Sequence, residues 1–335
     1  MINSFKANHL GIQLTQRRVL KVFKIILGLF GLIVLLLIGL FLKAYYAKDL
    51  PDFTESRLSL QTISIVQNDN SYYDLAKLPE NVSSNSPELI YFDQASEKNQ
   101  FADPAIIDPN KMNMDSTYGV KLNIIRAGAR AKIAQVDNLL SQGKNQEAFL
   151  EAEKIIKVGS TIANSQSPLI HYLAGVAVAK MGWQELDKIP VSDLSADLKK
   201  EHTAILAQYI DTRAGLKNAL KFEYITSSNT FSSGDLQNLT DKYQTTFVPG
   251  QTKFLPNKTK KLLAEMYLDW IDKLNRGCPI TFTETHYTPS KISIYFTENS
   301  VGRVVTDMIS IALKTVPNKM CDLENIANNV LSKLK

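Results

Sequence analysis

An uninterrupted apolar stretch from Ile25 to Leu42 constrains this chain more than any other feature of its sequence. Its eighteen residues carry no charged or hydrogen-bonding side chain, and Lys24 and Lys43 flank it. As an α-helix that rises about 1.5 Å per residue, the stretch would measure roughly 27 Å, close to the thickness of the hydrocarbon core of a bilayer. Helices buried in soluble proteins rarely remain apolar on every face over this length. We therefore predict a transmembrane helix over residues 25–43.

The charges on either side of this helix predict its orientation. Residues 1–24 contain five Lys and Arg and no Asp or Glu, whereas Lys43 and Lys48 on the other side are balanced by Asp49 and Asp52. Basic flanking segments remain on the cytoplasmic side of a membrane. We therefore expect a single-pass protein of the cytoplasmic (inner) membrane, with a basic cytoplasmic tail and with the rest of the chain outside.

A cleaved signal peptide is the competing interpretation, because it also has a basic start and an apolar middle. Its apolar region is shorter, about 7–15 residues, and it ends at a cleavage site with small residues. Here Tyr45 occupies a position where a small residue is required, and Tyr45 with Tyr46 suits the aromatic belt of a membrane interface. We expect an uncleaved anchor that contacts membrane lipids through residues 25–43.

The basic character of the chain, with a net charge of +5, is confined to its N-terminal part. Six of the 38 Lys and Arg lie at or before Lys43, so 32 remain against 33 Asp and Glu from residue 44 onward. A domain that binds nucleic acid would carry clustered positive charge. We expect no nucleic-acid partner.

The chain beyond the anchor is predicted to form a stalk and then an irregular helical bundle, so the predicted fold class is all-α. Five prolines and several Asn and Ser clusters interrupt residues 44–110. No long helix fits there, and we expect an extended, partly packed stalk. Helical apolar spacing then dominates residues 111–335, which predicts a helical extracytoplasmic domain. Residues 280–296 change to a period of two, which indicates one small β-hairpin.

Within the helical domain, the spacing of apolar residues predicts several individual helices. A stripe from Leu122 to Leu140 ends near Gly143 and leads into a second helix, so these two are expected to form an antiparallel hairpin. Residues Leu169 to Ala179 are apolar nearly throughout and are predicted to form the central buried helix. A single long helix is then expected from Leu194 to Phe222, followed by a Ser- and Thr-rich loop over residues 226–233.

His171 and Glu223 are the candidates for acid–base chemistry. His171 interrupts the apolar central helix, while Glu223 and Arg213 lie further along the chain on the next long helix. We interpret the three residues as a buried polar network with a structural role, and catalysis by His171 and Glu223 as the alternative. The sequence contains no zinc-binding His or Cys spacing and no glycine-rich phosphate loop, so we expect neither a metal nor a cofactor.

The chain has two cysteines, Cys278 and Cys321, and the expected topology places both outside the membrane. An oxidising compartment favours a disulfide between them, while buried free thiols are the alternative. Cys278 is expected at the end of one helix and Cys321 just before the last helix. At such places the backbone can adjust to the Cα separation of about 4.4–6.8 Å that a disulfide requires.

Four short segments resemble counterparts in other proteins, and they are Leu169-Ile170-His171-Tyr172-Leu173, Ala219-Leu220-Lys221-Phe222-Glu223-Tyr224, Leu255-Pro256-Asn257-Lys258-Thr259 and Asn299-Ser300-Val301-Gly302-Arg303. Through them the chain is similar to a loose set of uncharacterised bacterial proteins with one N-terminal anchor and a helical outer domain. The resemblance spans roughly residues 60–315, and Ser300 stands where a proline is expected. It implies a helical, membrane-tethered protein and supplies no activity.

These features predict a membrane-anchored binding or scaffolding module of the cell envelope, with another envelope protein as its partner. Tethering would keep the domain at a high local concentration near the membrane. The alternative is an envelope enzyme that uses His171 and Glu223. An enzyme would hold the pair in an open pocket, whereas a binding module would bury them and expose an apolar patch.

Overall fold

Helices make up all the regular structure in the part of the chain that the computed structural model describes, which is residues 2–106, 108–112, 122–232, 254–282 and 297–335, with side chains from residue 24 onward. The all-α prediction, with an apolar N-terminal helix ahead of the others, is confirmed. The α-helices are α1 Ile2–Tyr45, α2 Tyr72–Leu75, α3 Leu89–Ser96, α4 Leu122–Ser141, α5 Asn145–Ala163, α6 Leu169–Lys188, α7 Ala196–Ala207, α8 Arg213–Ser232, α10 Pro256–Lys273, α12 Ser300–Leu313 and α13 Val316–Leu334. The 3₁₀ helices are η1 Ser56–Leu58, η2 Gln67–Asp69, η3 Pro104–Ile106, η4 Pro109–Lys111, η5 Val191–Asp193 and η6 Leu274–Arg276.

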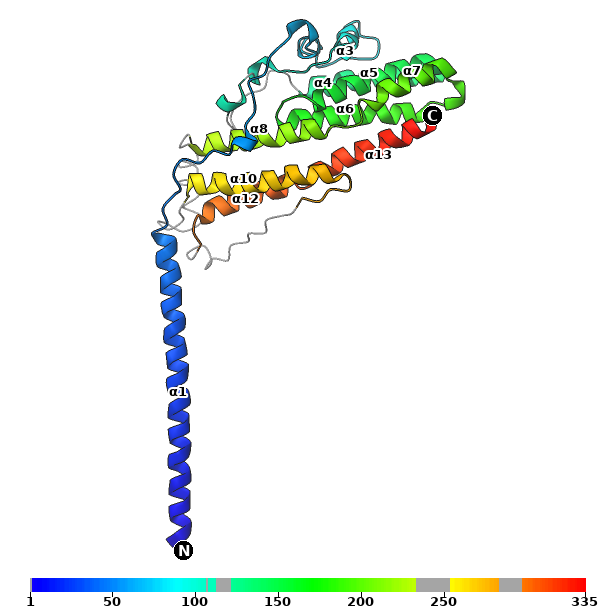
Figure 1. Ribbon diagram of the computed structural model, residues 1–335. Coiled ribbons are helices and arrows are strands. Elements are labelled where there is room, and N and C mark those ends of the chain that lie inside the picture. The colour runs from blue at the N-terminus through cyan, green and yellow to red at the C-terminus, as the bar shows by residue number, and fades with distance from the viewer. Residues whose placement is uncertain (1, 107, 113–121, 233–253, 283–296) are drawn as a thin grey trace.

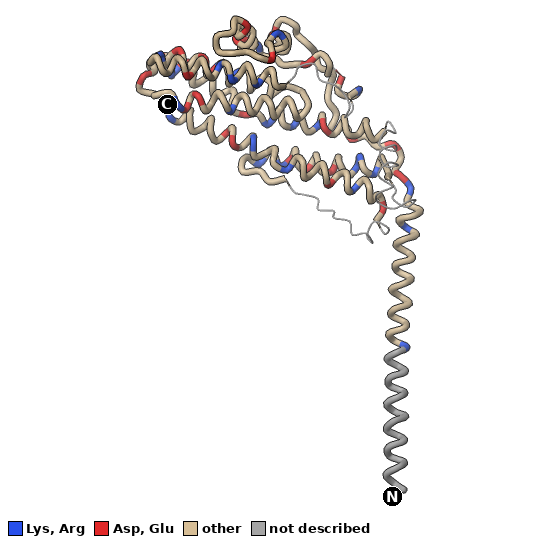
Figure 2. Tube along the Cα trace, turned by 180° about the vertical axis from the view of Figure 1, so that it is seen from behind, with Lys and Arg blue, Asp and Glu red and all other residues tan. Residues whose placement is uncertain are grey.

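The long helix α1 extends away from all the other helices, which lie together beyond its C-terminal end (Figure 1). Its segment Lys24–Tyr45 is long and apolar enough to cross a membrane, and the most apolar part of it is not buried anywhere in the molecule. Leu35, for example, is 68% exposed. In Figure 2 the described part of α1 is tan over most of its length, because its apolar segment carries no charged residue. A core helix of a soluble protein would instead cover such a surface.

The helical domain is built around α5 and α6, which pack against each other more extensively than any other pair (Figure 1). α4 covers both of them, and α13 packs on α6. α8 contacts α6 and α10, and α12 in turn lies on α10. The prediction of a central helix is confirmed, because α6 buries Tyr172, Val178 and Trp183 together with His171.

Glycines allow α5 and α6 to approach until their backbones touch. A Cβ atom on Gly159 would overlap the backbone nitrogen of Ala179, and one on Gly175 would overlap the backbone of Ala163. Gly215 at the start of α8 meets the carbonyl of Ala163 in the same way. Because backbone atoms cannot move aside as a flexible side chain can, a larger residue at these positions would separate the helices.

Residues 44–110 do not stand apart from the helical domain as a stalk would. Leu58, Leu75, Phe92 and Ile106 from this segment are fully buried in the core, and α3 packs on α4 and α5. The prolines exclude long helices, as expected, but the apolar residues between them still gain free energy when they leave water. The segment is a covering layer on one side of the bundle, and it packs more fully than the extended, partly packed stalk that we predicted.

The single helix expected from Leu194 to Phe222 is two helices, α7 and α8. Asp211 starts α8, because its side chain accepts a hydrogen bond from the backbone N–H of Arg213 at 2.9 Å. The carbonyl of Asp211 also accepts a hydrogen bond from the side chain of Asn164 at 3.2 Å, which holds the break against α5. An acidic residue before a helical run is an N-cap signal, and it outweighs the continuous apolar spacing here.

The loop expected over residues 226–233 is also wrong, since α8 continues to Ser232. The hydroxyl groups of Thr226 and Thr230 donate to carbonyls four residues earlier in the helix, at 3.1 and 2.9 Å. Asn229 donates to the carbonyls of Asn110 and Met112 at 2.8 Å. Polar side chains that form hydrogen bonds to the helix backbone or to a neighbouring segment are satisfied within a helix, so a Ser- and Thr-rich stretch can remain helical.

Cys278 and Cys321 form a disulfide, with their Cα atoms 5.7 Å apart. Cys278 follows η6, but Cys321 lies inside α13 and not before it, because α13 begins at Val316 with Pro317 in its first turn. The expected position of Cys321 is corrected. The β-hairpin expected over residues 280–296 lies, apart from residues 280–282, outside the described part of the chain.

Loss of the disulfide should destabilise the domain. The two cysteines are 43 residues apart, and closing a loop of that length stabilises the folded state by about 4 kcal/mol in the chain-entropy view. We expect Cys321→Ser to unfold at lower urea concentration than the oxidised wild type and to migrate more slowly on a non-reducing denaturing gel. A Cys278→Ser, Cys321→Ser double variant and the reduced wild type should match the single variant. Labelling of both thiols in unreduced, unfolded wild type would contradict the bond.

Candidate functional site

His171 lies in the first turn of α6 and is fully enclosed by the protein. Its ring centroid lies 5.6 Å from that of Phe101. Burial lowers the pKa of the imidazole to about 4, although the negative charge of Asp103 acts in the opposite direction. A general acid or base works best with a pKa near the working pH. His171 is therefore a neutral ring of the core at neutral pH.

The three residues expected to form one polar network make contacts in different places. Glu223 Oε1 accepts a hydrogen bond from the backbone N–H of Leu169 at 3.1 Å, so that it caps the first turn of α6. Burial raises the pKa of Glu223, while this hydrogen bond acts to lower it. Arg213 Nη2 donates to Glu324 Oε2 at 2.7 Å and so joins α8 to α13. These contacts hold helices together, which is what the structural interpretation requires.

An open cleft of about 670 Å³ lies on the surface where residues 61–64 and 99–101 meet the C-terminal end of α5. Its walls carry amide and hydroxyl side chains, two aromatic rings and no charged group. Some of these amides hold the wall together, as when Gln100 Nε2 donates to the carbonyl of Ser64 at 2.8 Å. Thr161 of α5 also lines the cleft. A surface of this chemistry suits uncharged polar groups of a ligand. A charged ligand group would be removed from water there without gaining a counterion, which costs free energy.

The junction between α1 and the domain is fixed by a helix cap that joins distant parts of the chain. Asp49 accepts hydrogen bonds from the backbone N–H groups of Asn257 and Lys258, both at 3.0 Å. These groups belong to the first turn of α10, where a carboxylate satisfies open donors and interacts favourably with the helix dipole. The side chain of Asn257 also donates to the carbonyl of Leu50 at 3.1 Å. The domain is therefore joined to the end of α1 by specific contacts.

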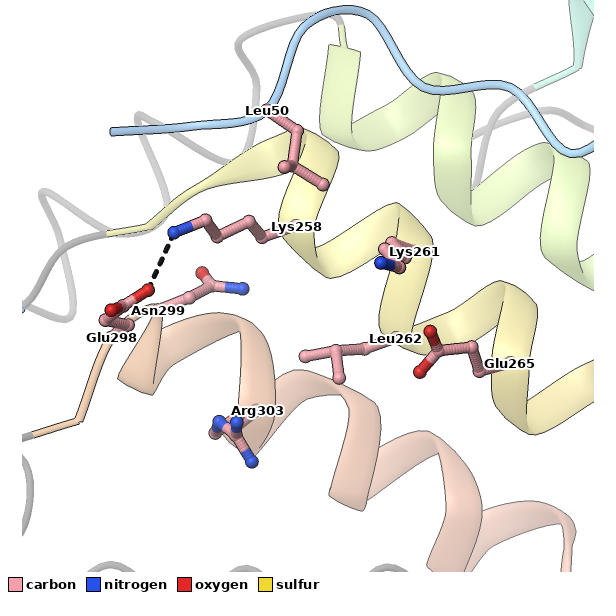
Figure 3. A pocket seen from close by; sticks show the side chains of 8 residues that line it. All are labelled: Leu50, Lys258, Lys261, Leu262, Glu265, Glu298, Asn299 and Arg303. Carbon is pink, nitrogen blue, oxygen red and sulfur yellow. Dashed lines mark hydrogen bonds and ion pairs between the residues drawn. The ribbon is translucent and has the colours of Figure 1, made fainter. Parts of the chain in front are cut away.

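A smaller pocket of about 270 Å³ opens beside this junction, between the N-terminal parts of α10 and α12 (Figure 3). Lys258 Nζ donates to Glu298 Oε2 at 2.8 Å, and Lys43 from the end of α1 lies 3.6 Å from the same carboxylate. Lys261 of α10 and Arg303 of α12 also line the pocket. The lining of the pocket thus combines three basic side chains with two carboxylates, Glu265 and Glu298, next to the end of the apolar helix.

Sequence reasoning identified His171 and Glu223 because they interrupt apolar faces, but it missed both surface sites. Neither His171 nor Glu223 lines the cleft or the junction pocket. Asp49 was used only to balance charge, although its position just beyond the anchor could have marked it as a helix cap. In the described part of the chain, no three His, Cys, Asp or Glu residues form a group that could hold a metal ion.

No protein-family model, no curated protein and no solved structure matches this chain. The resemblance to bacterial membrane-tethered proteins therefore stays an expectation from the sequence.

The burial of His171 should make stability depend on pH. The pKa of His171 is about 4 in the folded protein and about 6.5 in the unfolded chain. As the pH falls below about 6.5, the unfolded chain therefore binds a proton that the folded chain does not bind. We expect the free energy of unfolding to decrease by about 3 kcal/mol as the pH falls through this range to below 4. His171→Gln should lack this contribution, as measured by urea unfolding at several pH values. An imidazole of His171 that titrates near 6.5 in folded protein, observed by NMR, would contradict the assignment.

Proposed function

We propose that the protein is a single-pass membrane protein of the cell envelope whose helical domain is a binding or scaffolding module. In this proposal residues 1–24 lie in the cytoplasm, residues 25–43 cross the cytoplasmic membrane, and the domain lies outside. The observation that carries the proposal is the junction at Asp49, which fixes the domain to the end of an exposed apolar helix. A domain held in this way stays next to the membrane, where a partner meets it at high local concentration.

The uncharged cleft at the end of α5 is the surface we assign to the partner. Its amide and hydroxyl side chains can exchange hydrogen bonds with a polar, uncharged segment of another envelope protein. Catalysis by His171 and Glu223 is less well supported. His171 is enclosed in the core with a pKa of about 4, and Glu223 is used to cap α6.

The topology can be tested with tags at the two ends of the chain. Protease added outside the cytoplasmic membrane should remove a C-terminal tag and leave an N-terminal tag intact, because only residues beyond the anchor are exposed there. The N-terminal tag should remain on the mature protein and resist extraction with alkaline carbonate. Protection of the C-terminal tag would overturn the orientation, and a mature chain beginning near Ala47 would show that the anchor is a cleaved signal peptide.

The binding surface can be tested by crosslinking in intact cells. A photoreactive amino acid replacing Thr161, inside the cleft, should give discrete adducts with an envelope protein. The same substitution at Leu150, which is 38% exposed and lies on the same helix outside the cleft, is the matched control. Equal adducts at both positions, or none at Thr161, would count against the cleft as the partner site.

A further inference from the structure

The helix α12 is packed with its polar side inward and its apolar side outward. Thr306 is 5% exposed and Ser310 is fully buried, whereas Met308 is 64% and Ile311 is 46% exposed. Ordinary surface helices have the opposite arrangement, with the apolar stripe facing the core. The exposed face is completed by Val301, Val304 and Ala312, whereas Val305, Ile309 and Leu313 at its edge pack partly against the core.

The inward polar side of α12 is a well-satisfied contact. Gly302 fits directly against the hydroxyl of Thr259 on α10, where a Cβ atom would collide. The hydroxyl of Thr306 donates to the carbonyl of Gly302 at 2.8 Å, and that of Ser310 donates to the carbonyl of Asp307 at 2.9 Å. Small residues thus allow α12 to lie close to α10, and their hydroxyls remain hydrogen-bonded. The outward direction of the apolar side follows from this packing and leaves an apolar surface that the described part of the chain does not cover.

The start of α12 is held at the end of the membrane-spanning segment. Asn299, which precedes α12, accepts a hydrogen bond from the backbone N–H of Leu255 at 2.8 Å, and so aligns the starts of α12 and α10. Glu298 lies 3.6 Å from Lys43, the residue that follows the apolar stretch of α1. Tyr45 and Tyr46 lie at the same end of α1 and are 53% and 70% exposed. Tyrosine side chains favour the interface between a membrane and water.

The direction of α12 suits a surface parallel to the membrane. The helix runs across the direction of α1, on the side of the domain that faces back along α1, while α3 lies on the opposite side (Figure 1). Fourteen residues of helix measure about 21 Å, and interfacial helices bury an apolar face by about 5–10 Å at the boundary between headgroups and acyl chains. Exposed Lys314 and Lys319 near the far end of α12, with Lys261 and Arg303 at the near end, match the charge of anionic headgroups.

We infer that the outer face of α12 rests on the lipid surface of the same membrane that α1 spans, with anionic headgroups at its two basic ends. This inference rests on the proposed anchoring by α1 and adds a second lipid contact, through Met308, Ile311 and their neighbours. The contact orients the domain on its side, so that the α3 side faces away from the membrane. It therefore distinguishes a fixed domain from one that swings on its anchor.

The test uses the full chain in nanodiscs that contain phosphatidylglycerol and a lipid-attached fluorescence quencher. An environment-sensitive fluorophore is attached to Met308→Cys without reduction, so that the Cys278–Cys321 disulfide stays closed. Matched labels are placed at Ile90→Cys on α3, which is 52% exposed, and at Leu35→Cys in the apolar part of α1. We expect lipid quenching and a blue-shifted emission at positions 308 and 35 and neither at position 90.

The three positions separate failure of the inference from failure of the anchor. An unquenched label at 308 with a quenched label at 35 would overturn the lipid contact while leaving the anchor intact. An unquenched label at 35 would remove the anchor itself, and the inference with it. A label at 308 that becomes protected only when two chains share a disc would assign the face to a second copy, which also overturns the inference.

A charged substitution provides a second readout that does not depend on the label's own preference for lipid. Ile311→Glu in the Met308→Cys chain should abolish quenching at 308, because a carboxylate is disfavoured at that depth. Leu150→Glu on α5, also an exposed apolar position, should leave it unchanged. Circular dichroism should show the same helix content in both variants. Persistent quenching in the Ile311→Glu chain would show that the face does not enter the lipid.

Discussion

The backbone contact between α5 and α6 is the constraint on which the rest of the domain depends. Gly159 and Gly175 leave no space for a side chain between the two helices. Since packed interiors cannot absorb even one additional methyl group without strain, the position of α6 is fixed by this contact. α4, α8 and α13 then pack on a pair whose geometry is already set. This arrangement also determines the surroundings of the other buried residues of α6, including His171.

Two sets of buried charges in the described part of the chain connect different helices. Lys132 of α4 is almost fully buried and lies 2.8 Å from Asp93 of α3, and it also pairs with Glu151 of α5. Arg213 and Glu324 join α8 to α13 in the same manner. Removing one partner of such a pair leaves an unpaired buried charge, whereas the intact pair contributes little beyond a hydrophobic replacement. These pairs therefore specify which helices meet more than they stabilise the fold.

Specific contacts also form the junction between α1 and the domain. The cap that Asp49 makes on α10 ties the chain just beyond α1 to the domain. It places the starts of α10 and α12 next to the end of the apolar helix, so under the proposed anchoring α12 is the helix whose outward side chains would lie closest to lipid. The cleft of uncharged polar groups, which we propose for a partner, lies elsewhere on the domain. In these proposals, anchoring, orientation and binding use separate surfaces of one bundle.

The sequence alone determined the apolar segment of α1, the all-α class, the hairpin of α4 and α5, and the buried character of α6, because each is encoded in the spacing of neighbouring residues. It also drew attention to His171 and Glu223 as polar residues among apolar ones. The tertiary structure decided the rest. Asn229 of α8 bonds to the carbonyls of Asn110 and Met112, Asp49 caps a helix 208 residues away, and α12 turns its apolar side outward because small residues favour the other side against α10. Local patterns cannot reveal such partners, since the free energy of these contacts arises only when segments far apart in the chain meet.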